Sequence, residues 1–335
     1  MIIFLLFSLL LLTRPGESGL GLDLIQRDSA SSPFYDGSLS SFQCIQNAIQ
    51  RSLLFAAPSP LNPASTTNSS LKDYMMTITV NNSLSALTWF TVDTAGFPAG
   101  APCGPCYPYG TSSSTGLVSL GNASNSLLSS LNMTTFAYCL QSLDSQANSQ
   151  IYFGDVGNIL LPLISTPLYT AIPPGQENSY YCINLDSIGI GKETISLPRS
   201  GAGGNLIIEP STFLTYLPPD TVDAIIECFE TFNLYPRAYD VEEETGLLLC
   251  FDVLLSGDYF EVPPIVWNFD GVLLTLPIKG TFVEVQQGVQ CLTIVKTSGY
   301  AIWGSALQAY LNIEYDLKKN LCNIQLNDNC LSSPY

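Results

Sequence analysis

The sequence predicts an all-β protein with few helices. Short runs of β-branched and aromatic residues recur from residue 74 onward and are separated by Gly, Pro, Asn and Ser, a pattern typical of strands and turns. Hydrophobic residues make up 46% of the 335 residues and charged residues only 12%, so the chain can bury a core large enough for two lobes. The runs that we interpret as strands are residues 74–80, 86–92, 180–191, 264–269, 272–276, 281–286 and 290–295.

One segment has the period of a helix. Val222, Ile225, Ile226 and Phe229 lie at positions i, i+3, i+4 and i+7, directly after a pair of prolines. Proline is tolerated in the first turn of a helix because the N–H that it lacks has no partner there. Strands otherwise dominate, which favours an all-β architecture.

The amino-terminal segment resembles a signal peptide. Residues 2–12 form a mainly apolar run that is too short to cross a bilayer, and small residues follow it. We therefore expect residues 1–19 to be removed and the chain to be secreted to the extracellular space or apoplast, or delivered to the vacuole. A Pro/Ser/Thr/Asn-rich stretch from Ala56 to Ser70 reads as a linker and marks a boundary.

The cysteine content agrees with secretion. Ten cysteines in a chain with a signal sequence indicate disulfides rather than metal sites. Four Asn-X-Ser/Thr tripeptides are candidate glycosylation sites and support passage through the secretory pathway. Their asparagines are Asn68, Asn81, Asn122 and Asn132.

The sequence from Cys103 to Cys106 is CGPC, which has two interpretations besides a structural disulfide: a redox motif and part of a zinc site. A thioredoxin-like redox motif should follow a strand and begin a helix, whereas the sequence after Cys106 cannot continue a helix. A zinc site would need a second pair of ligands. We prefer a tight structural disulfide between the two cysteines.

Charge and composition exclude several classes of function. The chain has no histidine, which rules out Ser/His/Asp catalysis, Cys/His catalysis and His-ligated zinc. The formal charge of −17 opposes binding to nucleic acid or to an anionic membrane. The glycines of residues 201–204 lack the GK[ST] ending of a phosphate loop, and the acidic run 240–244 lacks the spacing of a calcium loop. We expect no cofactor and no metal.

Two apolar runs end in an acidic residue that is followed by hydroxyl residues. The first ends in Asp93 with Thr94, and the second in Glu209 with Ser211 and Thr212. A single acid at the end of a strand is usually a turn or cap residue. Two such sequences in one chain make carboxylate chemistry the candidate activity.

The surrounding motifs resemble those of plant nucellin-like and nepenthesin-like aspartic proteases, which belong to the pepsin family. The resemblance extends from about residue 22 to Cys330, and the motifs occur in the family's order. They are LIQRDSASSPFY, NAIQRS, PCGPCY, FAYCL, IYFG, STPL, GNLIIEPSTFLTYLP and IWGSALQAYLNIEYDL.

This resemblance implies a bilobal pepsin-like fold with one catalytic carboxylate from each lobe. The matching positions are Asp93 and Glu209, supported by Thr94 and Thr212. The pair would share a proton and activate a water against an extended peptide in the interlobe cleft. It also implies that the chain is a monomer, made of a signal peptide (1–19), a prosegment with linker (20–70), a truncated N-terminal lobe (71–168) and a C-terminal lobe (169–335).

The resemblance further implies two disulfides, Cys250–Cys291 and Cys139–Cys330. It assigns no partner to four cysteines. These are Cys44, Cys182, Cys228 and Cys322.

The sequence departs from the family at the catalytic motifs. The first motif reads Asp93-Thr94-Ala95 in place of Asp-Thr-Gly, and the second reads Glu209-Pro210-Ser211. A glutamate reaches about 1.5 Å farther than an aspartate, and proline removes a backbone N–H. Displacing a catalytic group by about 1 Å can cost on the order of a hundredfold in rate.

A second departure follows Cys106. The sequence passes almost at once to residues 110–122, which resemble a region that the family reaches only after the stretch carrying its flap. The flap's closure excludes water from the cleft. The resemblance implies that Gly100 replaces a cysteine whose partner lies in the missing stretch, so both partners are gone together. Ser119 replaces a glycine of the N-terminal lobe, whereas Gly304 keeps its counterpart in the C-terminal lobe.

We therefore expect a secreted pepsin-fold pseudopeptidase with little or no endopeptidase activity. One alternative is a working acid endopeptidase that uses Asp93 and Glu209. Another is a binding or inhibitory protein, as among plant xylanase-inhibitor relatives that share the fold. Loss of the second aspartate and of the flap argues against catalysis, and no partner-binding motif argues for inhibition.

Overall fold

The computed structural model describes twelve stretches of the chain. These are residues 19–56, 73–79, 87–94, 106–107, 117–121, 126–145, 147–154, 164–171, 180–198, 203–232, 234–254 and 260–327. None of the helices in these stretches is long and apolar enough to cross a membrane. The predicted signal peptide, apart from Gly19, and nearly all of the predicted linker lie outside them.

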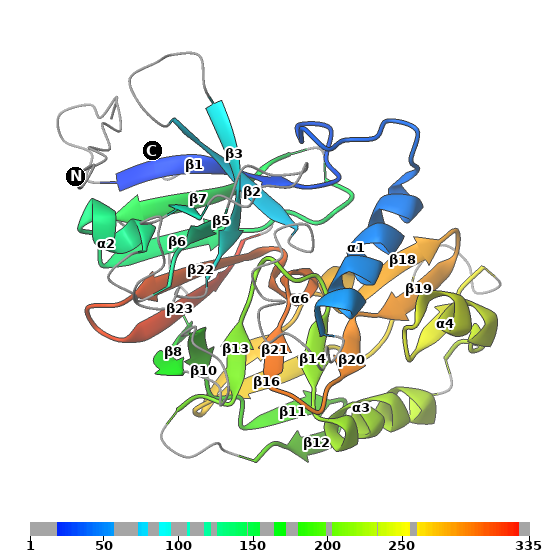
Figure 1. Cartoon of the computed structure of the whole chain (residues 1–335). Helices are drawn as coiled ribbons and strands as arrows, with labels where there is room; N and C mark the ends of the chain where they lie inside the picture. Colours follow the sequence, from blue (N-terminus) through cyan, green and yellow to red (C-terminus); the bar gives the residue numbers. More distant parts are fainter. Residues whose placement is uncertain are drawn as a thin grey trace.

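Within the described residues, a ten-stranded sheet takes strands from both ends of the chain (Figure 1). Its order is β4-β5-β3-β2-β1-β7-β6-β22-β23-β8, so strands of both predicted lobes meet in it. The strands are β1 (Gly19–Gln26), β2 (Tyr74–Thr79), β3 (Leu87–Asp93), β4 (Cys106–Tyr107), β5 (Leu117–Ser119), β6 (Thr135–Cys139), β7 (Ser149–Gly154), β8 (Ile164–Pro167), β22 (Leu311–Asp316) and β23 (Leu321–Leu326).

Strand β1 lies inside this sheet although its residues fall in the predicted prosegment. It pairs antiparallel with β7 from Gly19 to Leu24 and with β2 at Ile25 and Gln26. Leu24 and Ile25 are buried. The paired backbone and the buried side chains make β1 part of the structured core rather than a loose leader.

Three smaller sheets of described strands build the C-terminal half (Figure 1). The six-stranded sheet has the order β20-β14-β21-β13-β10-β9, the four-stranded sheet β12-β11-β16-β17, and the three-stranded sheet β15-β19-β18. The strands are β9 (Tyr169–Ala171), β10 (Tyr180–Ile183), β11 (Ser187–Ile190), β12 (Glu193–Ser196), β13 (Leu206–Ile208), β14 (Thr215–Leu217), β15 (Cys250–Asp252), β16 (Ile265–Phe269), β17 (Val272–Thr275), β18 (Phe282–Gln286), β19 (Val289–Leu292), β20 (Ile294–Lys296) and β21 (Ala301–Trp303). The predicted all-β class is confirmed.

Helix α1 (Ser41–Ala56) packs on this half (Figure 1). Ser40 and Gln43 form a capping box, in which each side chain bonds the backbone N–H of the other residue and fixes where the helix begins. Ile45, Ala48 and Ile49 on one helix face are buried in a cluster that also holds residues of β14 and β18. The sequence analysis did not predict this helix.

The helix expected after the two prolines is α3 (Pro219–Phe232). Val222, Ile225 and Phe229 are buried, and Ile226 is half-buried. The remaining helices are short. They are α2 (Leu127–Leu131), α4 (Tyr239–Thr245), α5 (Ile278–Thr281) and α6 (Ser305–Gln308).

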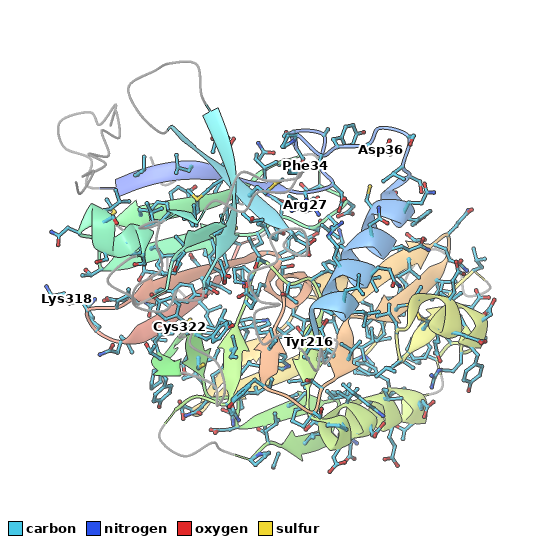
Figure 2. All side chains as sticks on the ribbon, in the orientation of Figure 1. Arg27, Phe34, Asp36, Tyr216, Lys318 and Cys322 are labelled. Carbon is cyan, nitrogen blue, oxygen red and sulfur yellow. A yellow bond between two sulfur atoms is a disulfide. The ribbon has the colours of Figure 1, made fainter. Side chains whose placement is uncertain are left out.

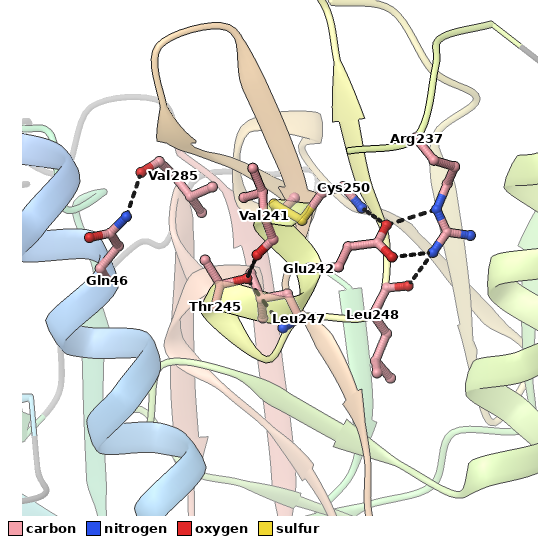
Figure 3. The surroundings of a disulfide bond; sticks show 10 residues. Gln46, Arg237, Val241, Glu242, Thr245, Leu247, Leu248, Cys250 and Val285 are labelled. Atoms are coloured by element: carbon pink, nitrogen blue, oxygen red, sulfur yellow. Dashed lines mark hydrogen bonds and ion pairs between the residues drawn. A yellow bond between two sulfur atoms is a disulfide. The ribbon is translucent and has the colours of Figure 1, made fainter. Parts of the chain in front are cut away.

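The structure contains the Cys250–Cys291 disulfide that the resemblance implies, between β15 and β19 (Figure 3). Glu242 on α4 supports it by accepting the backbone N–H of Cys250 at 2.8 Å and by pairing with Arg237 at 2.6 Å. Gln46 donates to the carbonyl of Val285 at 3.3 Å and so connects α1 to the same sheet. The disulfide thus lies where α1, α4 and the three-stranded sheet meet.

The other predicted cysteine pairs involve residues outside the described stretches. Cys139 is disulfide-bonded, but its expected partner Cys330 lies outside them. Cys103 also lies outside, so the Cys103–Cys106 pair stays a prediction. Of the four cysteines without an assigned partner, Cys44, Cys228 and Cys322 are free thiols. The fourth, Cys182, is buried and donates to the carbonyl of Tyr180 at 3.7 Å.

Of the four candidate glycosylation sites, only Asn132 is described. It is exposed at the end of α2 and adopts a left-handed conformation, with φ of 54°. Its position leaves it accessible to modification. Asn68, Asn81 and Asn122 lie outside the described residues.

Candidate active site

Asp93 is the last residue of β3. This strand pairs in parallel with β5, which places Asp93 opposite Ser119. The carbonyl of Asp93 accepts the N–H of Leu120 at 2.8 Å. The acid is therefore fixed where two parallel strands end.

Glu209 occupies the equivalent place in the C-terminal half. It directly follows β13, which pairs in parallel with β21 and places Ile208 opposite Trp303. The N–H of Glu209 donates to the carbonyl of Trp303 at 3.1 Å. The two acids thus lie in matching strand arrangements, as expected for two related lobes.

Thr94 brings the two arrangements together. Its hydroxyl donates to the carbonyl of Ile208 at 3.0 Å and lies 3.4 Å from Oε2 of Glu209. The hydroxyl that follows one acid therefore binds the turn that carries the other. The residues predicted as catalytic and supporting, Asp93, Thr94 and Glu209, meet at this point.

The reverse contact cannot form. By the symmetry of the two arrangements, the residue after Glu209 would supply a hydroxyl to the end of β3. That residue is Pro210, which is buried and has no hydroxyl. The hydroxyl contact that Thr94 makes with the turn of Glu209 therefore has no counterpart from Pro210.

The Glu209 carboxylate is held by its own turn. Oε1 accepts both the backbone N–H of Ser211, at 3.1 Å, and the hydroxyl of Ser211. Oε2 faces the hydroxyl of Thr94. Asp93 and Glu209 are each only 1% exposed. Ser211 thus satisfies Oε1 from within the same turn, and the Thr94 hydroxyl, which donates to Ile208 at the shorter distance, lies beside Oε2.

Thr212 supports the turn through its backbone rather than its side chain. Its N–H donates to the carbonyl of Glu209 at 3.4 Å, and its carbonyl accepts the N–H of Ser305 at 2.7 Å. Its hydroxyl is buried and has no hydrogen-bond partner among the described residues. The supporting role expected for Thr212 is therefore structural here.

The two glycine positions of the family turns differ in how tightly they are packed. Gly304 donates its N–H to Thr215 Oγ1 at 3.0 Å, and a Cβ at Gly304 would lie 2.1 Å from the carbonyl oxygen of Leu214. Ser119, in the N-terminal half, is fully buried, and its hydroxyl accepts the N–H of Gly121 at 3.3 Å. The N-terminal turn therefore accommodates a side chain.

A buried aromatic network lies within electrostatic range of Glu209. The hydroxyl of Tyr138 donates to Gln308 Oε1 at 2.6 Å and lies 3.0 Å from the hydroxyl of Tyr315. Burial raises the pKa of Tyr138 and Tyr315 well above the ordinary value, and the nearby charge of Glu209 adds to this shift. Both hydroxyls therefore stay protonated. Sequence reasoning missed this network because its members come from β6, α6 and β22.

A charged cluster also reaches the site from the predicted prosegment. Arg51 on α1 pairs with Asp73 at 2.6 Å and with Asp28 at 2.5 Å, and the N–H of Asp73 donates to the carbonyl of Ser211 at 2.9 Å. Burial raises the pKa of Asp73 even though the guanidinium of Arg51 opposes this shift. Asp73 therefore connects the N-terminal segment to the turn that holds Glu209.

Arg27 and Ser52 complete this connection. The N–H of Arg27 donates to the carbonyl of Asp73 at 2.8 Å, and its guanidinium lies 4.8 Å from the centroid of the Phe34 ring. Both residues are labelled in Figure 2. Ser52 accepts the N–H of Leu214 at 2.9 Å. Arg27, Asp28, Arg51 and Ser52 occur in the two prosegment motifs, but nothing in their spacing indicates Asp73 as a partner.

Comparison with known proteins supports the resemblance. The family profile described as xylanase inhibitor C-terminal matches residues 180–324. The aspartic proteinase nepenthesin-2 of Nepenthes gracilis is 31% identical over 219 residues, which cover 63% of this chain and 49% of the relative. Nepenthesin-1 of the same plant is 28% identical over 217 residues, or 62% of this chain and 48% of the relative. The chain is a homologue of the plant pepsin-like aspartic proteases.

This aspartic protease homologue spans about half the length of the curated relatives it matches. Solved structures show the fold. Conglutin gamma from lupine seeds superposes with a TM-score of 0.54 at 20% identity, covering 76% of this chain and 67% of the other. Basic 7S globulin from soybean gives a TM-score of 0.54 at 18% identity, covering 78% and 70%.

Proposed function

We propose that this homologue is a secreted pseudopeptidase with little or no endopeptidase activity. The observation that carries the proposal is the state of Glu209, whose carboxylate is bound by Ser211 and Thr94 and is 1% exposed. The chemistry of the family needs two carboxylates that share a proton and hold a water against the peptide. A glutamate committed to its own turn is poorly placed for that task.

Access to the pair supports the same conclusion. Asp93 is as deeply buried as Glu209, so little of either acid's surface is open to a substrate. A general base must come within about 3 Å of the water it activates. The N-terminal segment adds to the obstacle, because Asp73 binds the carbonyl of Ser211 and is itself held by Arg51.

The short connection after Cys106 supports the loss of the flap. Strand β4 pairs antiparallel with β5, with Cys106 opposite Val118, and the sequence between the two strands is only residues 108–116. That interval is where the family carries its flap. The family's flap closes over the bound peptide and helps to hold it against the reacting groups, so its loss removes that positioning.

We also propose two alternative functions, an acid endopeptidase and a binding or inhibitory protein. A working endopeptidase would bind an extended peptide between the lobes and use Asp93 with Glu209. A binding or inhibitory protein is suggested by the description of the family profile that matches residues 180–324. An assay of whether the purified chain inhibits xylanases that degrade plant cell walls tests the inhibitory alternative. A pseudopeptidase without an inhibitory function should leave xylanase activity unchanged.

We expect the purified chain to show no acid proteolysis. An unfolded protein substrate incubated with it between about pH 3 and pH 5, where a carboxylate pair would share one proton, should stay intact. No new amino terminus should form within the predicted linker, Ala56 to Ser70. A pepsin-type enzyme assayed in parallel is the positive control. Cleavage that disappears in Asp93→Asn would contradict the proposal and favour the working endopeptidase.

We also expect that repairing the second motif is not enough. The triple variant Glu209→Asp, Pro210→Ser, Ser211→Gly restores the family sequence there, but parts of an active site that act as a unit fail non-additively. Without the flap, the repaired pair should still show no measurable proteolysis in the same assay. If the triple variant cleaves and the starting chain does not, the second motif was the sole lesion.

A further inference from the structure

A second concave site lies apart from the candidate active site. It is a cavity of about 490 Å³ between the first turn of α1, the loop that follows β6, and helices α5 and α6. None of the residues Asp93, Thr94 and Glu209 lines this cavity. Its volume falls within the range of about 300–1,000 Å³ that is usual for sites binding small ligands.

Aromatic side chains from distant parts of the chain form its walls. Phe42 comes from α1, Phe213 from the turn after Glu209, and Phe282 from β18. Phe260 completes this surface and packs edge-to-face on Phe282, with ring centroids 5.1 Å apart. Rings in this arrangement favour a ligand that carries aromatic groups of its own.

Charged residues of both signs line the same cavity. Lys279 in α5 and Asp144 in the loop after β6 are exposed, and Glu284 on β18 is half-buried. The exposed charges mark the rim. A purely anionic ligand would be repelled by the net charge of −17. A ligand with one positive and one negative end matches the rim instead.

Polar groups and a constrained backbone lie on another side. The hydroxyl of Tyr74 reaches the carbonyl of Gln141 at 3.5 Å. Tyr310 has φ of 66°, and its N–H donates to the carbonyl of Leu140 at 3.0 Å. A tyrosine held in the left-handed region is uncommon, and such conformations concentrate at functional positions.

We propose that this cavity binds a short peptide with aromatic side chains and free termini. Its carboxylate lies at Lys279, its ammonium group at Asp144 and Glu284, and its rings against Phe42, Phe213, Phe260 and Phe282. This site is independent of peptide hydrolysis at Asp93 and Glu209. A protein without activity at the first site would still bind such a peptide at the second.

Isothermal titration calorimetry with the dipeptide Phe-Phe tests the proposal. We expect saturable binding with a dissociation constant below about 1 mM. The same dipeptide with its amine acetylated and its carboxylate amidated should bind at least about tenfold more weakly, because it lacks both charges. Gly-Gly, which keeps the charges but lacks the rings, should not bind measurably.

Lys279→Glu should weaken binding of Phe-Phe by about tenfold or more. The matched control is Lys318→Glu, which makes the same charge change in the turn between β22 and β23, at the edge of the molecule remote from α1 (Figure 2). It should bind like the unaltered chain. Should Lys279→Glu fail to fold by circular dichroism, Phe42→Ala removes one wall and should reduce binding as well. Absence of saturable binding, equal affinity for the capped dipeptide, or an equal effect of both lysine variants overturns the proposal.

Discussion

Replacing Gly304 by alanine should destabilise the chain by more than about 4 kcal/mol, or prevent it from folding. A Cβ at this position would lie 2.1 Å from the carbonyl oxygen of Leu214 and 2.7 Å from that of Phe213. Both obstacles are backbone atoms and cannot rotate away. Gly304 follows β21, which pairs with both β13 and β14, so any shift there disturbs the turn that carries Glu209.

Gly189→Ala is the matched control. Gly189 lies in β11, and a Cβ there would meet its nearest neighbours, atoms of Val266, at 3.7 Å, which is ordinary van der Waals contact. Its unfolding free energy should stay within about 1 kcal/mol of the starting chain. Urea unfolding followed by circular dichroism measures both variants. Equal transition midpoints would show that the close approach at Gly304 is not required.

The strands could be predicted because their signal is local. Runs such as residues 264–269 and 281–286 became β16 and β18, and the helical period after the two prolines became α3. The candidate catalytic residues could also be found, because each acid ends an apolar run and is followed by hydroxyl residues. The cross-lobe bond from Thr94 to Ile208 could not, because the residues that it joins are 114 positions apart.

The N-terminal segment shows where sequence reasoning failed. Ile45, Ala48, Ile49 and Ser52 follow a helical period, and a capping box precedes them, so α1 could have been found from these signals. The surface of the C-terminal half against which α1 packs could not be found from such local signals. Neither composition nor spacing indicates the ion pair between Arg51 and Asp73, because most of the sequence between them has no usable periodicity.

The two halves of the site have diverged to different degrees. In the C-terminal half the close packing at Gly304 is kept while the catalytic acid and the next two residues are changed. In the N-terminal half the acid is kept while Ser119 replaces a glycine. Thr94 still makes the bond that joins the two halves at the site, whereas Pro210 cannot supply its counterpart. The proposed pseudopeptidase predicts such a pattern.

Arg51→Met should cost about 3–5 kcal/mol of stability near pH 7, because it leaves the carboxylate of Asp73 buried without its charged partner. Asp73 is 1% exposed, and its Oδ2 already has no hydrogen-bond partner among the described residues. Asp28, which Arg51 also binds, is closer to solvent. The double variant Arg51→Met, Asp73→Asn removes the stranded charge and should recover most of the loss.

The pH dependence of this loss follows from the direction of the Asp73 shift. Because burial raises its folded-state pKa above the unfolded value, the folded chain binds the proton more tightly. Its contribution to stability is therefore fully present below about pH 4 and is lost as the pH rises through the folded pKa. Removing Arg51 takes away the group that opposes the shift, so the penalty should be large near pH 7 and small below about pH 4.

Urea unfolding at both pH values measures this difference. Lys296→Met is the control, because Lys296 and Asp223 form an ion pair with side chains 39% and 60% exposed, which should be worth about 1 kcal/mol or less at either pH. A loss in Arg51→Met that is equal at both pH values, or that the double variant does not recover, would contradict the account. In that case Arg51 would stabilise α1 through packing, and Asp73 would not couple the N-terminal segment to the turn of Glu209.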